Sequence, residues 1–286
     1  MTYTTLISPQ QLNALLPGEA VVIVDCRFNL ADTGWGENEY RQSHIPGAVY
    51  AHLDRDLSSP VITGKTGRHP LPDPENLIHL FSGWGIGNQT QVIAYDQAGG
   101  GIAARLWWLL RWLGHDQVAV LDGGWAKWVQ AGYPVSDLPA SSSASVFNAQ
   151  IRNEYIADIE EFTSSHQTYL LIDARENPRY LGETEPIDPV AGHIPGARSL
   201  PFAGNIGENG YFLPPEQLRK RFMEVLGNIR HEKSITYCGS GVTACHNLLA
   251  MAHAGLGMGK LYPGSWSEWI TDPARPVAVG EENFKE

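Results

Sequence analysis

Cys238 is the residue of this chain whose surroundings best suit covalent chemistry. It opens the segment CGSGVTAC (238–245), which follows a β-like apolar run and leads into a helical pattern. A glycine-containing loop between a strand and a helix points its backbone N–H groups at one spot, where the helix dipole also stabilises negative charge. A thiolate suits that spot. We therefore predict that Cys238 is a nucleophile whose charged form is held by the backbone of Gly239, Ser240, Gly241, Val242, Thr243 and Ala244.

Other roles for this loop fit the sequence less well. A cysteine phosphatase would need an arginine after five intervening residues, in a C-x₅-R pattern, but that position is Ala244. Structural zinc sites space their cysteines more closely than Cys238 and Cys245, and no histidine pair stands nearby, so no metal is expected. Packing as a small apolar residue is the alternative for Cys238, and it is the role we expect of Cys245 and Cys26. The neutral loop instead suits a weakly hydrated sulfur species such as a persulfide.

The chain repeats itself, and the repeat predicts the elements that position Cys238. The matching blocks are VIVDCR (22–27) with LIDAR (171–175), SHIPGAVY (43–50) with GHIPGARS (192–199), and LDGGWAKW (121–128) with LYPGSWSEW (261–269). Because the blocks keep their order, they indicate a tandem duplication of one unit. The serine-rich segment 138–149 is expected to be the linker between a domain at 1–137 and a domain at 150–286.

Each half alternates apolar runs with helical patterns. The runs at 21–25 and 169–173 end in aspartate, and those at 91–96 and 234–238 each precede a glycine-containing turn. This alternation predicts an α/β fold in which each domain is a mostly parallel sheet flanked by helices. Ligands of such sheets bind at the carboxyl ends of the strands, where Asp96 and Cys238 stand. The segment GWGENEY (34–40) is expected to be a loop.

Composition excludes several classes of protein. A length of 286 residues fits about two domains. Thirty-one acidic against twenty basic residues give a net charge of −11, which disfavours nucleic acids and anionic membranes as partners. The most apolar run, 106–113, is interrupted by Arg111 and too short to span a bilayer. Three cysteines and the absence of an apolar leader in the first ten residues predict a reducing, cytoplasmic setting.

Together these motifs resemble the rhodanese superfamily, specifically its two-domain sulfurtransferases of the mercaptopyruvate and thiosulfate type. The resemblance covers essentially the whole chain and rests on two HIPGA boxes, CGSGVTAC and GSWSEW. It implies two tandem rhodanese-like domains, no cofactor, and a cysteine that takes sulfane sulfur from a small anionic donor. The resulting persulfide would pass its sulfur to a thiol, such as thioredoxin or a small thiol, or to cyanide.

The resemblance also assigns unequal roles to the two halves. Aligning YDQAGGG with YCGSGVT puts Asp96 where Cys238 stands. A carboxylate cannot accept sulfane sulfur, so the first domain is expected to be catalytically inactive. The histidines of the HIPGA boxes, His44 and His193, occur in both halves, and we expect them to fix the turns by hydrogen bonds.

Donor choice is the finer question. Thiosulfate-specific members typically carry cationic side chains in the loop, so the neutral loop here resembles the mercaptopyruvate branch. In that branch a serine, a histidine and an aspartate assist proton movement, and Ser240, His69 and Asp54 match them by position. Arg179 matches the arginine that contacts the anionic group of the donor. A second arginine often follows nine positions later, but here that residue is Asp188, which disfavours an anionic donor unless it faces away.

The leading expectation is thus a transferase that uses 3-mercaptopyruvate. One alternative is a thiosulfate:cyanide sulfurtransferase that uses the same cysteine. The other is a non-catalytic sulfur carrier or redox-sensing binding protein, in which a partner loads Cys238 and Cys245 resolves it.

Overall fold

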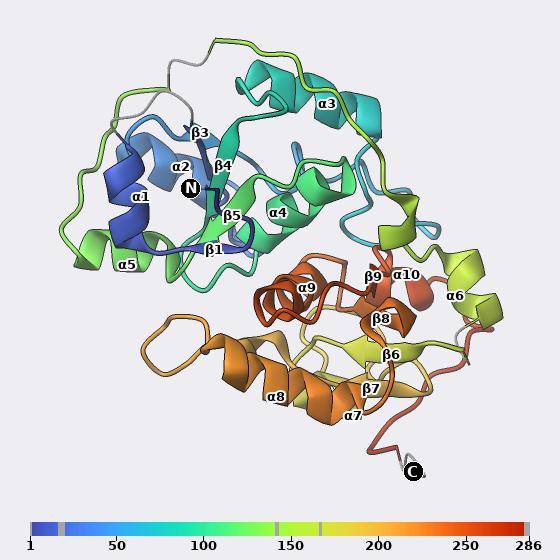
Figure 1. The fold of residues 1–286 in the computed structure, drawn as a ribbon. Helices are drawn as coiled ribbons and strands as arrows, with labels where there is room; N and C mark the ends of the chain where they lie inside the picture. The colour runs from blue at the N-terminus through green and yellow to red at the C-terminus, as the bar shows by residue number, and fades with distance from the viewer. Residues whose placement is uncertain (1, 17–20, 141–142, 166–167, 283–286) are drawn as a thin grey trace. The chain divides into compact units, whose positions relative to one another are not determined.

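A computed structural model describes residues 2–16, 21–140, 143–165 and 168–282 (Figure 1). The described residues fall into two compact units. The first lies within 1–59, 71–152 and 208–212, and the second within 60–70, 153–207 and 213–286. Segment 60–70 therefore belongs to the second unit, although it comes from the first half of the chain. The linker expected at 138–149 includes two residues, 141 and 142, outside the described residues, and its boundaries stay a prediction.

The first unit is built on a parallel sheet in the order β1-β5-β4-β2-β3. Its described strands are β1 (Leu6–Ile7), β2 (Val21–Asp25), β3 (Val49–Tyr50), β4 (Gln91–Tyr95) and β5 (Val118–Leu121). Its described helices are α1 (Pro9–Leu15), α2 (Trp35–Gln42), α3 (Pro74–Gly83), α4 (Ala103–Trp112) and α5 (Gly124–Gln130). Helix α4 packs against β4 and β5 on one face, while Leu12 of α1 and Trp128 of α5 join the core on the other.

The second unit repeats this plan with a parallel sheet in the order β7-β6-β8-β9. Its described strands are β6 (Leu170–Asp173), β7 (Ala197–Ser199), β8 (Ser234–Tyr237) and β9 (Lys260–Leu261). Its described α-helices are α6 (Ile159–Ser165), α7 (Asn177–Leu181), α8 (Pro215–Leu226), α9 (Ala244–His253) and α10 (Ser265–Trp269). Helix α9 packs against β8 and α8, and aromatic side chains of α6, α7 and α10 fill the core at the sheet. The predicted α/β class with two parallel sheets is confirmed.

The repeated sequence blocks form the same contacts in both units. At the end of β2, Asp25 holds Arg27 by an ion pair of 2.7 Å, and the equivalent Asp173 and Arg175 at the end of β6 pair at 2.6 Å. The HIPGA histidines are buried, and Nδ1 of each lies 2.6–2.7 Å from the carbonyl oxygen of a tyrosine in the preceding helix, α2 or α7. These contacts tie the turns to their helices, as expected, so the histidines of the HIPGA boxes have a structural role.

The expectation of a loop at 34–40 is wrong, because α2 begins at Trp35. Gly34 and Gly36 suggested a loop, but Gly36 serves close packing: a Cβ there would lie 1.8 Å from the carbonyl oxygen of Arg27. An ion pair between Glu37 and Arg41, one turn apart, supports the helix.

Candidate active site

Cys238 lies one residue beyond β8, at the carboxyl end of a strand that has a neighbour on each side. Its thiol is buried with the rest of the residue, which is 1% exposed. Helix α10 anchors its backbone: the N–H of Cys238 donates to Oγ of Ser265 at 3.1 Å, and its carbonyl oxygen accepts from the N–H of Trp266 at 3.0 Å. Ser265 adopts a left-handed φ of 56° to make this contact. The repeated GSWSEW block thus positions the backbone of Cys238.

The loop after Cys238 is short, neutral and tightly folded. Gly241 has a φ of +75°, and a Cβ there would lie 2.3 Å from the carbonyl oxygen of Pro263, so only glycine fits. Helix α9 starts directly after the loop, at Ala244. The chain therefore turns from strand to helix within a few residues, which directs the first N–H groups of the helix toward the loop.

Most N–H groups of this loop carry no acceptor. None of the hydrogen bonds found among the described residues is donated by the backbone N–H of Gly239, Ser240, Val242, Thr243 or Ala244. These residues are buried, apart from the half-buried Thr243. Buried N–H groups are normally paired, so a cluster of unpaired ones beside a cysteine marks a place built for a negative charge.

The equivalent loop of the first unit shows what such a backbone holds. Asp96 follows β4 as Cys238 follows β8. Its carboxylate accepts from the N–H groups of Gly100 at 3.0 Å, Ile102 at 2.8 Å and Ala103 at 3.1 Å. Burial raises the pKa of the Asp96 carboxyl, and these hydrogen bonds oppose that rise. The first unit therefore fills its loop with a carboxylate of its own.

The structure brings together two members of the predicted relay. Nδ1 of His69, in segment 60–70 of the second unit, lies 2.7 Å from Oγ of Ser240, two residues after Cys238. Asp54 belongs to the first unit, where its backbone N–H donates to Nδ1 of His52 at 3.2 Å. The place of Asp54 in the relay stays a prediction.

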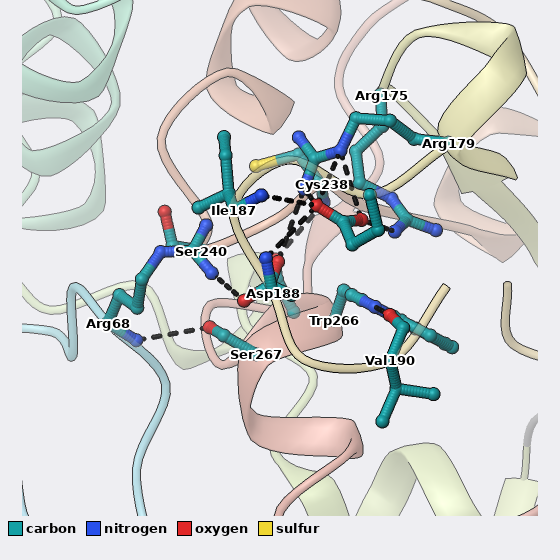
Figure 2. A network of polar contacts seen from close by, with 12 residues as sticks. Arg68, Arg175, Arg179, Ile187, Asp188, Val190, Cys238, Ser240, Trp266 and Ser267 are labelled. Atoms are coloured by element: carbon teal, nitrogen blue, oxygen red, sulfur yellow. Dashed lines mark hydrogen bonds and ion pairs between the residues drawn. The ribbon is translucent and has the colours of Figure 1, made fainter. Parts of the chain in front are cut away.

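Arg179 lies in α7 and is held by acidic side chains (Figure 2). Its Nε and Nη2 donate to the carboxylate of Glu185 at 2.6–3.0 Å, and Nη2 also contacts Oδ2 of Asp188 at 3.2 Å. Burial alone would raise the pKa of the Glu185 carboxyl, but the hydrogen bonds from Arg179 and from two backbone N–H groups outweigh it and lower that pKa. Arg179 is thus fixed rather than freely solvated.

Asp188 does not face away from this site. Its Oδ1 contacts Nη1 of Arg68 while its Oδ2 contacts Arg179, so Figure 2 shows it between the two guanidinium groups. Burial raises the pKa of the Asp188 carboxyl, while Arg68 and Arg179 oppose that rise. The negative charge of Asp188, which by itself would disfavour an anionic donor, is therefore compensated by two arginines.

Sequence reasoning missed Arg68 and Ser267. The N–H of Arg68 donates to Oγ of Ser267 at 3.0 Å, which ties segment 60–70 to α10. The only sequence signals were the position of Arg68 beside His69, in GRHPLP, and that of Ser267 in the repeated GSWSEW block. Within the described residues, no group of three histidine, cysteine or acidic side chains could hold a metal ion, and none of the helices is long and apolar enough to cross a membrane.

The family model of the rhodanese-like domain matches residues 8–131 and 157–272 of this chain, one match in each half. The chain belongs to the rhodanese family. The first matched region contains β2, β3, β4 and β5, and the second contains β6, β7, β8 and β9.

Full-length relatives place this rhodanese-family chain among the sulfurtransferases. A protein of Pseudomonas aeruginosa named "Probable 3-mercaptopyruvate sulfurtransferase" is 48% identical over 284 residues, which cover 98% of this chain and 100% of the relative. Thiosulfate sulfurtransferase of Cricetulus griseus is 33% identical over 276 residues, 92% of this chain and 90% of the relative. The solved structure of 3-mercaptopyruvate sulfurtransferase from Leishmania major is 30% identical, with a TM-score of 0.83 over 93% of this chain and 74% of that one. This protein is a two-domain rhodanese-family sulfurtransferase, which takes sulfur from a donor and passes it to an acceptor.

Proposed function

We propose that Cys238 is the sulfur carrier of this enzyme and that 3-mercaptopyruvate is its donor. The observation that carries the proposal is the buried cluster of N–H groups without acceptors that follows Cys238. A persulfide of Cys238 ends in a negatively charged sulfur one atom farther out than the thiolate. The five N–H groups supply the dipoles that stabilise such a charge away from water.

The reaction divides into two displacements at sulfur. The Cys238 thiolate attacks the sulfur of 3-mercaptopyruvate, a new S–S bond forms, and the C–S bond of the donor breaks. The electron pair of that bond leaves on carbon as the enolate of pyruvate, which takes up a proton. The acceptor, a thiolate or cyanide, then attacks the outer sulfur, the S–S bond breaks, and the Cys238 thiolate is regenerated.

The contact between Ser240 and His69 suits the proton movement of the first displacement. The donor enters with a proton on its sulfur, and the enolate leaves needing one. A hydroxyl two residues from the nucleophile, with an imidazole nitrogen 2.7 Å away, can relay a proton between these two places.

Thiosulfate is the second candidate donor. The neutral side chains of the loop favour 3-mercaptopyruvate, but the guanidinium groups of Arg68 and Arg179 lie close to Gly239 and could also serve a dianion. The names of the relatives include both activities. The alternative of a sulfur carrier or redox sensor has less support. It needs Cys245 to react with Cys238, but Cys245 is fully buried and its thiol donates a hydrogen bond to the carbonyl oxygen of Gly241 at 3.3 Å. These contacts are typical of a cysteine that packs in the core.

The acceptor and the compartment complete the proposal. We assign the acceptor role to a thiol, such as thioredoxin or a small thiol, or to cyanide, and the reaction to the cytoplasm. The three free cysteines support a reducing setting.

The experiment that tests the proposal is the intact mass of the reduced protein after brief exposure to 3-mercaptopyruvate or, separately, to thiosulfate. We expect one added sulfur atom from 3-mercaptopyruvate, none in Cys238→Ser, and normal loading in the matched variant Cys245→Ser. Loading from thiosulfate alone would overturn the donor assignment and keep that of the cysteine. Normal loading of Cys238→Ser would overturn the assignment of the cysteine.

A further inference from the structure

Arg68 places a second guanidinium group beside the nucleophile, and it comes from a segment that the sequence motifs of the second half do not include. A Cβ built on Gly239 would lie 2.7 Å from Nη2 of Arg68, and 3.6 and 3.8 Å from Nη2 and Nη1 of Arg179. Both guanidinium groups therefore lie against the residue that directly follows Cys238. We propose that Arg68 and Arg179 together grip the carboxylate of the sulfur donor, which makes Arg68 a specificity-determining residue; the inference rests on the proposed function of Cys238.

Carboxylates fix both arginines from one side. Asp188 contacts Nη1 of Arg68 and Nη2 of Arg179 (Figure 2). Glu185 accepts hydrogen bonds from Nε of Arg179. The backbone of Arg68 is also fixed, through Oγ of Ser267. The two guanidinium groups are thus held in place before any ligand arrives, which reduces the entropy lost on binding.

Other donor atoms of the same arginines remain unused. None of the hydrogen bonds among the described residues involves Nε or Nη2 of Arg68 or Nη1 of Arg179, and Nε of Arg68 is buried. A buried donor without an acceptor is costly, so these atoms favour a ligand that supplies acceptors. A planar carboxylate matches the fork of a guanidinium group, since its two oxygens can accept two parallel hydrogen bonds.

The charges around the arginines select among anions. Arg68 and Arg179 are balanced by Glu185 and Asp188, and the ion pair at the end of β6 that contacts Glu185 is itself neutral. A ligand with one negative charge adds one charge to a neutral network, whereas a dianion adds two, and an uncompensated charge is costly where side chains are largely buried. The structure therefore favours a small donor with a single carboxylate.

The test measures single-turnover loading of Cys238 by intact mass, as a function of 3-mercaptopyruvate concentration. In Arg68→Gln we expect the half-saturating concentration to rise about tenfold and the maximal rate to change less than about threefold. The matched control is Arg230→Gln, which also removes an ion-paired arginine of the second unit. Arg230 precedes β8 and so stands at the opposite end of the strand from Cys238; its loss should leave both quantities unchanged.

A donor without the charge isolates the role of the carboxylate. With the methyl ester of 3-mercaptopyruvate, wild type and Arg68→Gln should load with the same half-saturating concentration. An equal loss with acid and ester would overturn the inference, because Arg68 would then act on the loop rather than on the carboxylate. Unchanged half-saturation with the acid would overturn it too.

Exchanging the charges of Arg68 and Asp188 tests whether the loss of binding can be rescued. Arg68→Asp should weaken donor binding more than Arg68→Gln, because it adds a negative charge beside Asp188. Combining it with Asp188→Arg restores one arginine and one aspartate to the pair, so binding should recover most of that loss. A double variant as weak as Arg68→Asp would count against the inference. If wild type itself fails to load at Cys238, the proposed function falls, and that result is distinct from any difference between variants.

Discussion

Nδ1 of His69 lies 2.7 Å from Oγ of Ser240, although 171 positions separate the two residues in the chain. The residues are 5% and 6% exposed, so the contact is sheltered from water. Ser240 stands two residues after Cys238, so the contact joins a hydroxyl and an imidazole in the loop that follows the proposed nucleophile.

This contact predicts a donor-dependent effect of Ser240→Ala. Desulfuration of 3-mercaptopyruvate requires a proton to move, whereas attack of a thiolate on thiosulfate releases sulfite without one. We expect the maximal rate with 3-mercaptopyruvate to fall about a hundredfold, and the rate with thiosulfate to change far less. Steady-state rates with both donors measure this. His69→Gln should lose as much as Ser240→Ala, and the double variant little more, because the two act as one unit. Equal losses with both donors would contradict the relay.

Two glycines of the loop that follows Cys238 should respond differently to alanine. At Gly241 the φ of +75° and the carbonyl oxygen of Pro263 leave no room for a Cβ, so Gly241→Ala should lower the free energy of unfolding by about 2 kcal/mol or more. At Gly239 the Cβ would meet only the ends of flexible arginine side chains. Gly239→Ala should therefore fold normally but weaken donor binding severalfold. Thermal unfolding and single-turnover loading separate the two effects, and equal unfolding temperatures would contradict the prediction for Gly241.

Asp96 should matter for the stability of the first unit and not for chemistry. Asp96→Asn keeps the size of the side chain but turns an NH₂ group toward at least one of the N–H groups that the carboxylate now accepts from. We expect a loss of about 1–3 kcal/mol in the free energy of unfolding, with persulfide loading at Cys238 unchanged. Denaturant unfolding and intact mass measure the two quantities. Unchanged stability would show that the carboxylate is not what holds this loop.

The sequence predicted the parts of this molecule that depend on local patterns. The apolar runs gave the strands that end at Asp25, Tyr95, Asp173 and Tyr237 nearly to the residue, because these strands are buried and continuous in sequence. The loop after Cys238 could also be predicted, because the strand, the glycines and the helix that form it follow one another directly in the sequence.

Contacts between distant segments could not be read in this way. Arg68 lies 120 residues from Asp188, and nothing in its own neighbourhood shows that its guanidinium group lies beside Gly239. The surroundings of Asp188 could not be predicted either. Its charge disfavours an anionic donor when the sequence is taken alone, but in the structure it is paired with Arg68 and Arg179. Short edge strands such as β1 and β9, with two residues each, also carry too little pattern to predict.

The pH dependence of stability should expose Asp122, which follows β5 in the first unit. Burial raises the pKa of its carboxyl to about 6, although the N–H groups of Phe212 and Gly123 donate to it and oppose that rise. The ordinary pKa of aspartate is about 3.9, so between pH 4 and 6 the folded protein binds this proton more tightly than the unfolded chain does. The stabilisation that results is complete below about pH 4 and is lost as the pH rises through 6.

Asp122→Asn tests this directly, because the amide keeps an acceptor for the N–H of Phe212 and does not titrate. At pH 4 the variant and the wild type should unfold at the same denaturant concentration. At pH 7.5 the variant should be the more stable by about 2 kcal/mol, since only the wild type then buries a charge. Other groups titrate equally in both proteins and cancel in the difference. A difference that stays constant from pH 4 to 7.5 would show that the Asp122 carboxyl is ionised throughout, and that the two N–H groups outweigh its burial.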